Sequence, residues 1–232
     1  MIDLYYWPTP NGWKISIMLE EVGLPYKLVP VDIGRGDQFK PEFLAISPNN
    51  RMPAIVDHDP KDAKDNAAPL AIFESGAILE YLADKSGKLL STELRGRFDA
   101  LQWLYWQVGG IGPMTGQYGH FRSYAKDKIV YAIQRYEDEV HRLWGVLDAR
   151  LNGRSFIAGD YSIADIAVWC WVAGGVKQNL FEGEFPNVRR WVDEVGARPA
   201  VQRGRAVGEG LARSTPIDDE ARKHLFGQRA RK

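Results

Sequence analysis

A short turn near the start of the chain brings together side chains that could bind an anion. Residues 2–7 form a β-prone run, and residues 8–12 (PTPNG) interrupt it before a helical pattern begins. The Thr9 hydroxyl, the Asn11 amide and the N-terminus of the following helix are all hydrogen-bond donors. They could stabilise negative charge on a bound ligand. The same residues also fit a simple turn after Pro8, and their spacing alone leaves both interpretations open.

The composition is that of an ordinary globular protein. Of the 232 residues, 45% are hydrophobic and 26% are charged, which excludes a collagen-like or disordered chain. The 30 basic residues balance the 30 acidic ones, so we expect no strong attraction to nucleic acid or to an anionic membrane surface. The four histidines show no metal-ligand spacing, and we therefore predict no metal site.

Three features of the sequence predict a cytoplasmic protein. Residues 1–8 lack the basic stretch and apolar run of a signal peptide. The longest apolar segment, residues 163–176, contains Asp165 and is too short to span a bilayer. The one cysteine, Cys170, permits no internal disulfide, which suits a reducing compartment. Cys170 stands between two tryptophans, and we expect it to be a buried apolar residue rather than a nucleophile.

The N-terminal part of the chain alternates between strand and helix patterns. Helix patterns cover residues 15–22, 41–47 and 78–86. Strand patterns cover residues 2–7, 26–33, 54–57 and 70–73. The order β-α-β-α-β-β-α is that of the thioredoxin fold, an α/β fold with a mixed sheet. We predict such a domain over residues 1–87.

After Gly87 the strand patterns stop and long helical periodicities follow. They cover residues 94–108, 131–151, 163–176 and 188–195. This change predicts an all-α domain over residues 92–210, followed by a mobile tail at residues 211–232. The glycine-rich and proline-containing stretch 109–116 predicts a kink or local unwinding. Ser162 and Asp165 have the spacing of a capping box at the start of a helix.

Several motifs in these two parts resemble the cytosolic glutathione transferase family. Pro53 stands in RMPAI (residues 51–55), where that family has a cis-proline. ESGAI (74–78) matches its glutathione-binding turn, and residues 162–165 match its helical folding motif. Within the family, the chain resembles the nu class, the bacterial glutathione-dependent disulfide-bond oxidoreductases related to the yeast nitrogen-regulatory prion protein. The segments that carry this likeness are PTPNG (8–12), GDQF (36–39), ISPNNRMPAIVDH (46–58) and WQVGGIGPM (106–114).

The resemblance implies a glutathione site on the thioredoxin-like domain. Most glutathione transferases have a tyrosine, serine or cysteine at the first turn, whereas this chain has Thr9 and Asn11 and no thiol there. Any sulfur chemistry would then use the sulfur of the ligand, with Thr9 and Asn11 as the catalytic donors. The N-terminus of the next helix would help to lower the pKa of the ligand thiol.

Other parts of the motifs would bind the rest of glutathione. Ser75, at the start of a helix, would hold the γ-glutamyl carboxylate, and Glu74 would pair with the ammonium group. A Glu-Ser pair before a helix is also an ordinary capping signal. Met52, directly before Pro53, would offer its backbone N–H and C=O to the cysteinyl residue in the manner of an added strand.

The remaining contacts implied by the resemblance involve three polar residues and a group of aromatic ones. Gln38 and Arg51 would contact the glycyl end of glutathione. Arg135 matches an arginine that reaches a second glutathione in the nu class, although it could equally form a surface pair with Glu139. The aromatic residues that could line a second-substrate pocket, or simply form core, are Trp7, Tyr105, Trp106, Tyr118, Phe121 and Tyr124.

The leading functional hypothesis is a glutathione-dependent disulfide-bond oxidoreductase. Such an enzyme would bind two glutathione molecules or glutathione disulfide as co-substrate and would use the ligand thiolate, not a protein cysteine. The first alternative is conjugation of glutathione to an electrophile by the same thiolate. The second is a non-catalytic glutathione-binding or interaction module, since fold alone does not decide function. The resemblance also implies a homodimer.

Overall fold

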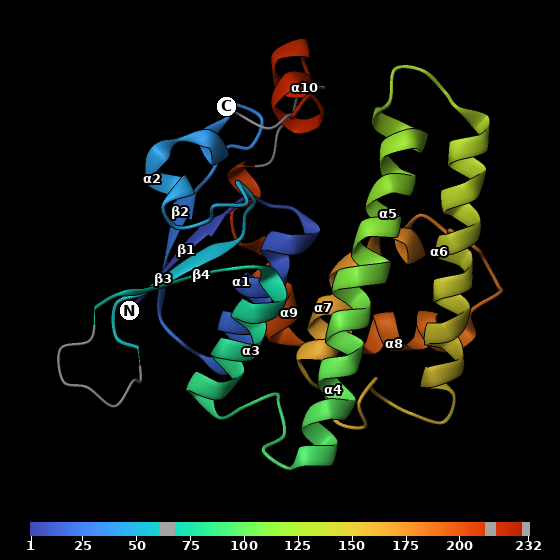
Figure 1. Cartoon of the computed structure of the whole chain (residues 1–232). Helices are drawn as coiled ribbons and strands as arrows, with labels where there is room; N and C mark the ends of the chain where they lie inside the picture. Colours follow the sequence, from blue (N-terminus) through green and yellow to red (C-terminus); the bar gives the residue numbers. More distant parts are fainter. Residues whose placement is uncertain (61–67, 212–216, 229–232) are drawn as a thin grey trace. The chain divides into compact units, whose positions relative to one another are not determined.

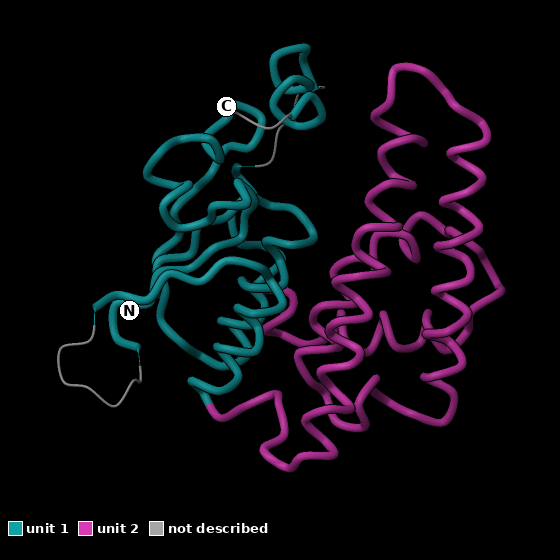
Figure 2. Tube along the Cα trace, in the orientation of Figure 1, with its two compact units in different colours: residues 1–86, 203–232 teal, residues 87–202 magenta. Residues whose placement is uncertain are grey.

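The computed structural model describes residues 1–60, 68–211 and 217–228. The chain forms two compact units, residues 1–86 with 203–232, and residues 87–202 (Figure 2). This division differs from the domain boundaries predicted from the sequence because residues 203–210 group with the N-terminal unit. There the hydroxyl of Ser16 donates to the carbonyl oxygen of Gly204 at 2.7 Å.

The first unit contains the mixed sheet that the strand patterns predict. Strand β1 lies in the centre beside β3, in the order β2-β1-β3-β4 (Figure 1). β1 runs parallel to β2 and antiparallel to β3, and β3 runs antiparallel to β4. The strands are β1 (Ile2–Tyr6), β2 (Tyr26–Pro30), β3 (Ala54–Asp57) and β4 (Leu70–Phe73).

The helices of the first unit follow the predicted order, which confirms the β-α-β-α-β-β-α succession. They are α1 (Pro10–Val22), η1 (Asp37–Phe39), α2 (Pro41–Leu44), α3 (Ser75–Ser86), η4 (Glu209–Leu211) and α10 (Asp219–Phe226). The predicted mobility of residues 211–232 stays a prediction, and its segments 212–216 and 229–232 lie outside the described residues. Residues 219–226 of this tail form a helix that the helical patterns of the sequence did not predict.

Alternation along β1 separates the two layers that cover the sheet. Ile2, Leu4 and Tyr6 are buried to 2% exposure or less, whereas Tyr5 packs against a second cluster with Phe43 of α2. α1 and α3 contact each other extensively. Successive side chains of a strand point to opposite faces of its sheet, so β1 contributes side chains to the packing on both faces.

The second unit is helical, as predicted. Its helices are α4 (Leu94–Trp106), η2 (Gln107–Ile111), α5 (Gly112–Gly119), η3 (His120–Tyr124), α6 (Val130–Leu151), α7 (Ile163–Lys177) and α8 (Pro186–Gly196), with α9 (Pro199–Ala206) crossing into the first unit. The stretch predicted to kink stays helical, but η2 and η3 are π-helical turns on either side of α5. Pro113 lies in the first turn of α5, where its missing N–H is tolerated.

The predicted capping box at the start of α7 is confirmed. The Ser162 hydroxyl accepts a hydrogen bond from the backbone of Ala164, and Asp165 accepts one from the N–H of Ser162. Asp165 is fully buried and also accepts hydrogen bonds from Ile157 N–H and from the indole of Trp191. Burial raises the pKa of Asp165, against the lowering effect of these donors.

Candidate functional site

The turn between β1 and α1 is held by Thr9 and Met52. Thr9 is the N-cap of α1, and its hydroxyl accepts a hydrogen bond from Gly12 N–H at 3.4 Å. The Met52 sulfur lies 3.9 Å from the Thr9 hydroxyl oxygen and accepts a hydrogen bond from Trp7 N–H at 3.1 Å. Asn11 lies half-buried in the first turn of the helix. The structure therefore places both predicted donors at the N-terminus of α1.

The peptide bond between Met52 and Pro53 is cis, as the family resemblance predicts. Both residues are buried, and the Met52 side chain belongs to the cluster that includes Phe43 and Trp7. Ser47 supports the preceding loop because its hydroxyl donates to the carbonyl oxygen of Arg51 at 2.8 Å. The backbone of Met52 therefore lies beside the β1–α1 turn, joined to it through its own sulfur.

Ser75 is the first residue of α3, and its hydroxyl has a partner that sequence reasoning missed. Lys14 Nζ of α1 lies 3.1 Å from Ser75 Oγ, and the two residues are only 2% and 9% exposed. Lys14 precedes Met18 by one helical turn, so a charged residue stands on the apolar face of α1. A lysine on an apolar helix face was the signal in the sequence that could have indicated this contact, because a buried ammonium group needs hydrogen-bond acceptors around it.

Glu74 has a backbone conformation that a glutamate rarely adopts. Its φ is 70°, in the left-handed region. Its carbonyl accepts from Ile78 N–H in the first turn of α3, and its exposed carboxylate accepts from the Asn49 side-chain amide at 3.2 Å. Strain of this kind concentrates at functional sites. Glu74 directly precedes Ser75 in the chain, and its exposed carboxylate is accessible from solvent.

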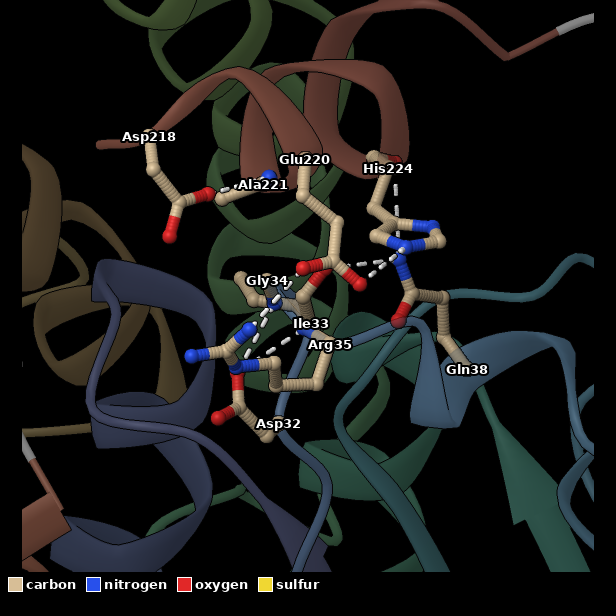
Figure 3. A network of polar contacts seen from close by, with 9 residues as sticks. All are labelled: Asp32, Ile33, Gly34, Arg35, Gln38, Asp218, Glu220, Ala221 and His224. Carbon is tan, nitrogen blue, oxygen red and sulfur yellow. Dashed lines mark hydrogen bonds and ion pairs between the residues drawn. The ribbon is translucent and has the colours of Figure 1, made fainter.

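The two residues expected at the glycyl end differ in their exposure to solvent. Arg51 is exposed, whereas Gln38 is only 2% exposed. The Gln38 amide nitrogen donates to the carbonyl oxygen of Ile33 at 3.0 Å and lies 3.5 Å from the carbonyl oxygen of His224 in α10 (Figure 3). The amide oxygen of Gln38 is buried and has no hydrogen-bond partner among the described residues.

Arg135 lies in the second unit, on an aromatic pocket of α5, η3 and α6. The pocket has a volume of about 300 Å³, and its residues are Met114, Phe121, Tyr131, Ala132, Arg135, Tyr136 and Glu139. The rings of Phe121 and Tyr136 are stacked at 5.6 Å. Glu139 accepts two hydrogen bonds from Arg142, which lower its pKa, and the charge of Arg135 adds to this lowering without an ion pair within 4.0 Å in the described part of the chain. Of the six aromatic residues proposed from the sequence, Phe121 lines this pocket.

Other findings bear on the remaining predictions. Cys170 is 4% exposed within α7, which confirms that it is buried. In residues 1–60, 68–211 and 217–228, no three His, Cys, Asp or Glu side chains form a group that could hold a metal ion. Within the same residues, no helix has the length and apolarity needed to cross a membrane.

Comparison with family models identifies the chain. The model of the glutathione S-transferase N-terminal domain matches residues 1–84, and that of the C-terminal domain matches residues 98–199. The chain belongs to the glutathione S-transferase family. The mixed sheet, the cis bond before Pro53 and the helical second unit are therefore features of a glutathione transferase fold.

Similar proteins of this family have names that refer to disulfide chemistry or to glutathione. The chain is 54% identical over 201 residues to the Escherichia coli disulfide-bond oxidoreductase YfcG, covering 86% of this chain and 92% of that protein. A Pseudomonas fluorescens glutathione transferase family member with two glutathione molecules bound has a TM-score of 0.82 at 48% identity, covering 88% of this chain and 92% of that one. A Pseudomonas putida glutathione transferase has one glutathione disulfide bound per subunit. Its TM-score is 0.83 at 45% identity, with 89% and 91% of the two chains covered.

Proposed function

We propose that this glutathione transferase is a glutathione-dependent disulfide-bond oxidoreductase that uses the thiolate of its ligand. The observation that carries the proposal is the composition of the β1–α1 turn, which offers a hydroxyl, an amide and a helix N-terminus but no protein thiol. The sole cysteine of the sequence is buried in α7, in the other unit. The names of the similar proteins support the same chemistry.

Thr9, Asn11 and the N-terminus of α1 stabilise the glutathione thiolate. A free thiol has a pKa of about 8.5. A helix N-terminus stabilises an anion by about 0.3–1 kcal/mol, and up to about 2 kcal/mol where it is partly buried. One pKa unit corresponds to about 1.36 kcal/mol. The helix dipole and one or two hydrogen bonds therefore lower the pKa of the glutathione thiol towards neutral pH. No protein base is needed.

The reaction is a pair of thiol-disulfide exchanges. The thiolate of one glutathione attacks a disulfide sulfur, which forms a mixed disulfide with glutathione and releases the other sulfur as a thiolate that takes up a proton. The thiolate of a second glutathione then attacks the glutathione sulfur of the mixed disulfide. Glutathione disulfide forms, and the substrate leaves as its second thiol. Two glutathione molecules are oxidised as one substrate disulfide is reduced.

The remaining predicted residues bind the parts of glutathione that do not react. Ser75 and the free N–H groups of α3 hold the γ-glutamyl carboxylate, and Glu74 pairs with the ammonium group. The backbone of Met52, at the cis bond before Pro53, pairs with the cysteinyl residue. The glycyl end lies towards Gln38 and Arg51. Arg135, beside its aromatic pocket, binds the second glutathione.

A coupled assay with glutathione and a small mixed disulfide tests this function. We expect turnover that falls strongly in the variants Thr9→Ala and Asn11→Ala and is retained in Cys170→Ala. Loss of turnover in Cys170→Ala would contradict the ligand-thiol mechanism. A parallel assay with an aryl halide separates the alternatives, because conjugation without disulfide reduction indicates an ordinary transferase. Glutathione binding without either activity indicates a binding module.

We also propose that the protein is a cytoplasmic homodimer. Exposed apolar side chains on α4 support a dimer, since Leu94, Phe98 and Tyr105 are 72%, 59% and 60% exposed and recur at helical spacing. Such a patch on a helical surface is typical of an interaction site. Light scattering coupled to size-exclusion chromatography measures the mass, and Phe98→Glu is expected to shift it from dimer to monomer.

A further inference from the structure

The C-terminal helix α10 is bonded to the segment that is proposed to hold the glycyl end of glutathione. Glu220 accepts a hydrogen bond from the Arg35 guanidinium at 3.0 Å, and the backbone oxygen of His224 lies 3.5 Å from the Gln38 amide nitrogen (Figure 3). Just after α10, the side-chain oxygen of Gln228 accepts from the Asn50 amide at 3.3 Å. In these contacts the donors belong to residues 35–50 and the acceptors to residues 220–228.

Apolar packing and close approach accompany these polar contacts. Ala221 of α10 is fully buried, and the ring of His224 lies 6.1 Å from that of Phe39. A Cβ at Gly36 would lie 2.9 Å from the His224 ring, so this glycine lets the helix approach the loop. Gly36 also has a φ of +86°, a conformation that side chains disfavour. The helix α10 therefore packs closely against the loop around Gly36, and the contact is more extensive than one surface ion pair.

The contact with α10 engages the side-chain amide of Gln38, the residue assigned to the glycyl end of glutathione. One hydrogen of its amide nitrogen is bonded to Ile33, and the other faces the carbonyl oxygen of His224. That carbonyl also accepts a hydrogen bond from the Gln228 amide at 2.7 Å, which holds the end of the helix in place. A carbonyl oxygen of α10 is thus the second acceptor that faces the Gln38 amide, the donor assigned above to the glycyl end.

We propose that α10 occupies the glycyl subsite and so determines which ligands bind there. A glycyl carboxylate must compete with the carbonyl oxygen of His224 for the Gln38 donor. The bonds of Glu220 to Arg35 and of Gln228 to Asn50 hold α10 in this competing position. A ligand that ends at the cysteinyl residue, such as γ-glutamylcysteine, leaves α10 in place. The helix is therefore a specificity determinant that narrows the preference for glutathione over γ-glutamylcysteine. This inference rests on the proposed function, which assigns the glycyl end to Gln38.

Calorimetric titration of the full chain with glutathione and with γ-glutamylcysteine tests the proposal. The quantity that matters is the ratio of the two dissociation constants, glutathione over γ-glutamylcysteine. Glu220→Gln removes an exposed ion pair, and we expect the ratio to fall about two- to fivefold. Ala221→Arg places a large charged side chain at a fully buried position, and we expect a fall of roughly tenfold or more. Lys223→Gln, at an exposed position of the same helix, is the matched control and leaves the ratio unchanged.

The outcomes separate the inference from the proposed function. A ratio that stays constant in both Glu220→Gln and Ala221→Arg overturns the inference, and so does a ratio that rises, because α10 would then complete the glycyl subsite instead of occupying it. Glu220→Gln changes one exposed side chain, so its result stands even if Ala221→Arg does not fold. If the wild-type protein binds neither ligand, the proposed function fails, and this inference fails with it.

Discussion

The ammonium nitrogen of Lys14 lies 3.1 Å from the hydroxyl oxygen of Ser75, in the buried contact between α1 and α3. An ammonium group only donates hydrogen bonds, so the serine oxygen accepts. The hydroxyl proton of Ser75 is then directed to a different acceptor. In the proposed site that acceptor is the γ-glutamyl carboxylate, and Lys14 acts on the ligand by orienting Ser75.

We expect Lys14→Met to weaken glutathione binding by about tenfold or more, since a hydrogen bond to a charged group contributes about 1.5–3 kcal/mol. The test is a double-mutant cycle with Ser75→Ala, measured by calorimetry. If Lys14 acts through the serine hydroxyl, Lys14→Met has little further effect in the Ser75→Ala background. Equal effects in both backgrounds would show an independent role. Lys27→Met, at an exposed position of β2, is the control.

Thr9 has a structural role as well as the proposed catalytic one. Because its side chain caps α1, Thr9→Ala is expected to lower the free energy of unfolding by about 1 kcal/mol. The same change removes a donor from the proposed thiolate, so disulfide turnover should fall by more than the loss of folded protein explains. Thr9→Ser keeps the hydroxyl and should retain both stability and turnover. Urea unfolding and the coupled assay measure the two effects separately, and a Thr9→Ser variant as inactive as Thr9→Ala would argue against the hydroxyl.

Arg135 is expected to affect the second glutathione and not the first. Arg135 lines the aromatic pocket of α5, η3 and α6, and Glu139 in the same pocket is bonded to Arg142. In Arg135→Ala, we predict that the affinity for the second glutathione, measured by calorimetry, falls by about tenfold, as expected for a lost hydrogen bond to a charged group. If the second event becomes too weak to detect, the measured stoichiometry falls instead. Arg95→Ala removes the same charge from an exposed position of α4 and should bind like the wild type. Equal loss of both events in Arg135→Ala would contradict this role.

The stability of the first unit should depend on pH through Asp57 at the end of β3. Burial would raise the pKa of this carboxyl, but hydrogen bonds from Lys85, Tyr81 and the N–H of Asp59 outweigh it and hold the pKa below its ordinary value of 3.8. A lowered pKa in the folded state stabilises the protein at every pH above that of the unfolded group. This contribution is lost as the pH falls below about 4 and through the folded-state pKa.

Urea unfolding between pH 2.5 and pH 7 measures this effect. We expect the wild type to lose stability steeply below about pH 4. Asp57→Asn lacks the titrating group, so it should be less stable at neutral pH and should lose less stability on acidification. Asp84→Asn, at an exposed position of α3, is the control for general charge effects and should keep the wild-type pH dependence. An acid transition of unchanged size in Asp57→Asn would show that other carboxyls are responsible.

Local features of the chain were predictable because residues a few positions apart decide them. Strands β3 and β4 begin and end where the pattern predicts, and α1 ends at Val22 as the helix pattern over residues 15–22 predicts, followed by Gly23 in the left-handed conformation typical of helix ends. Ser162 and Asp165, three residues apart, form their capping box through hydrogen bonds within one helical turn. The π-helical turns on either side of α5 were not predictable in the same way, because a glycine-rich stretch permits several backbone paths.

The sequence by itself determined the order of strands and helices in residues 1–86, the family and the absence of a thiol at the first turn. Tertiary structure decided which side chains from distant parts of the sequence come into contact. Lys14 and Ser75 are 61 positions apart, and Arg35 and Glu220 are 185 apart. Their contacts arise from how α1 packs on α3 and how α10 fits the loop at Gly36. Periodicity describes one element at a time, so it could not place a lysine beside the serine of another helix or bury Gln38 beneath the C-terminal one.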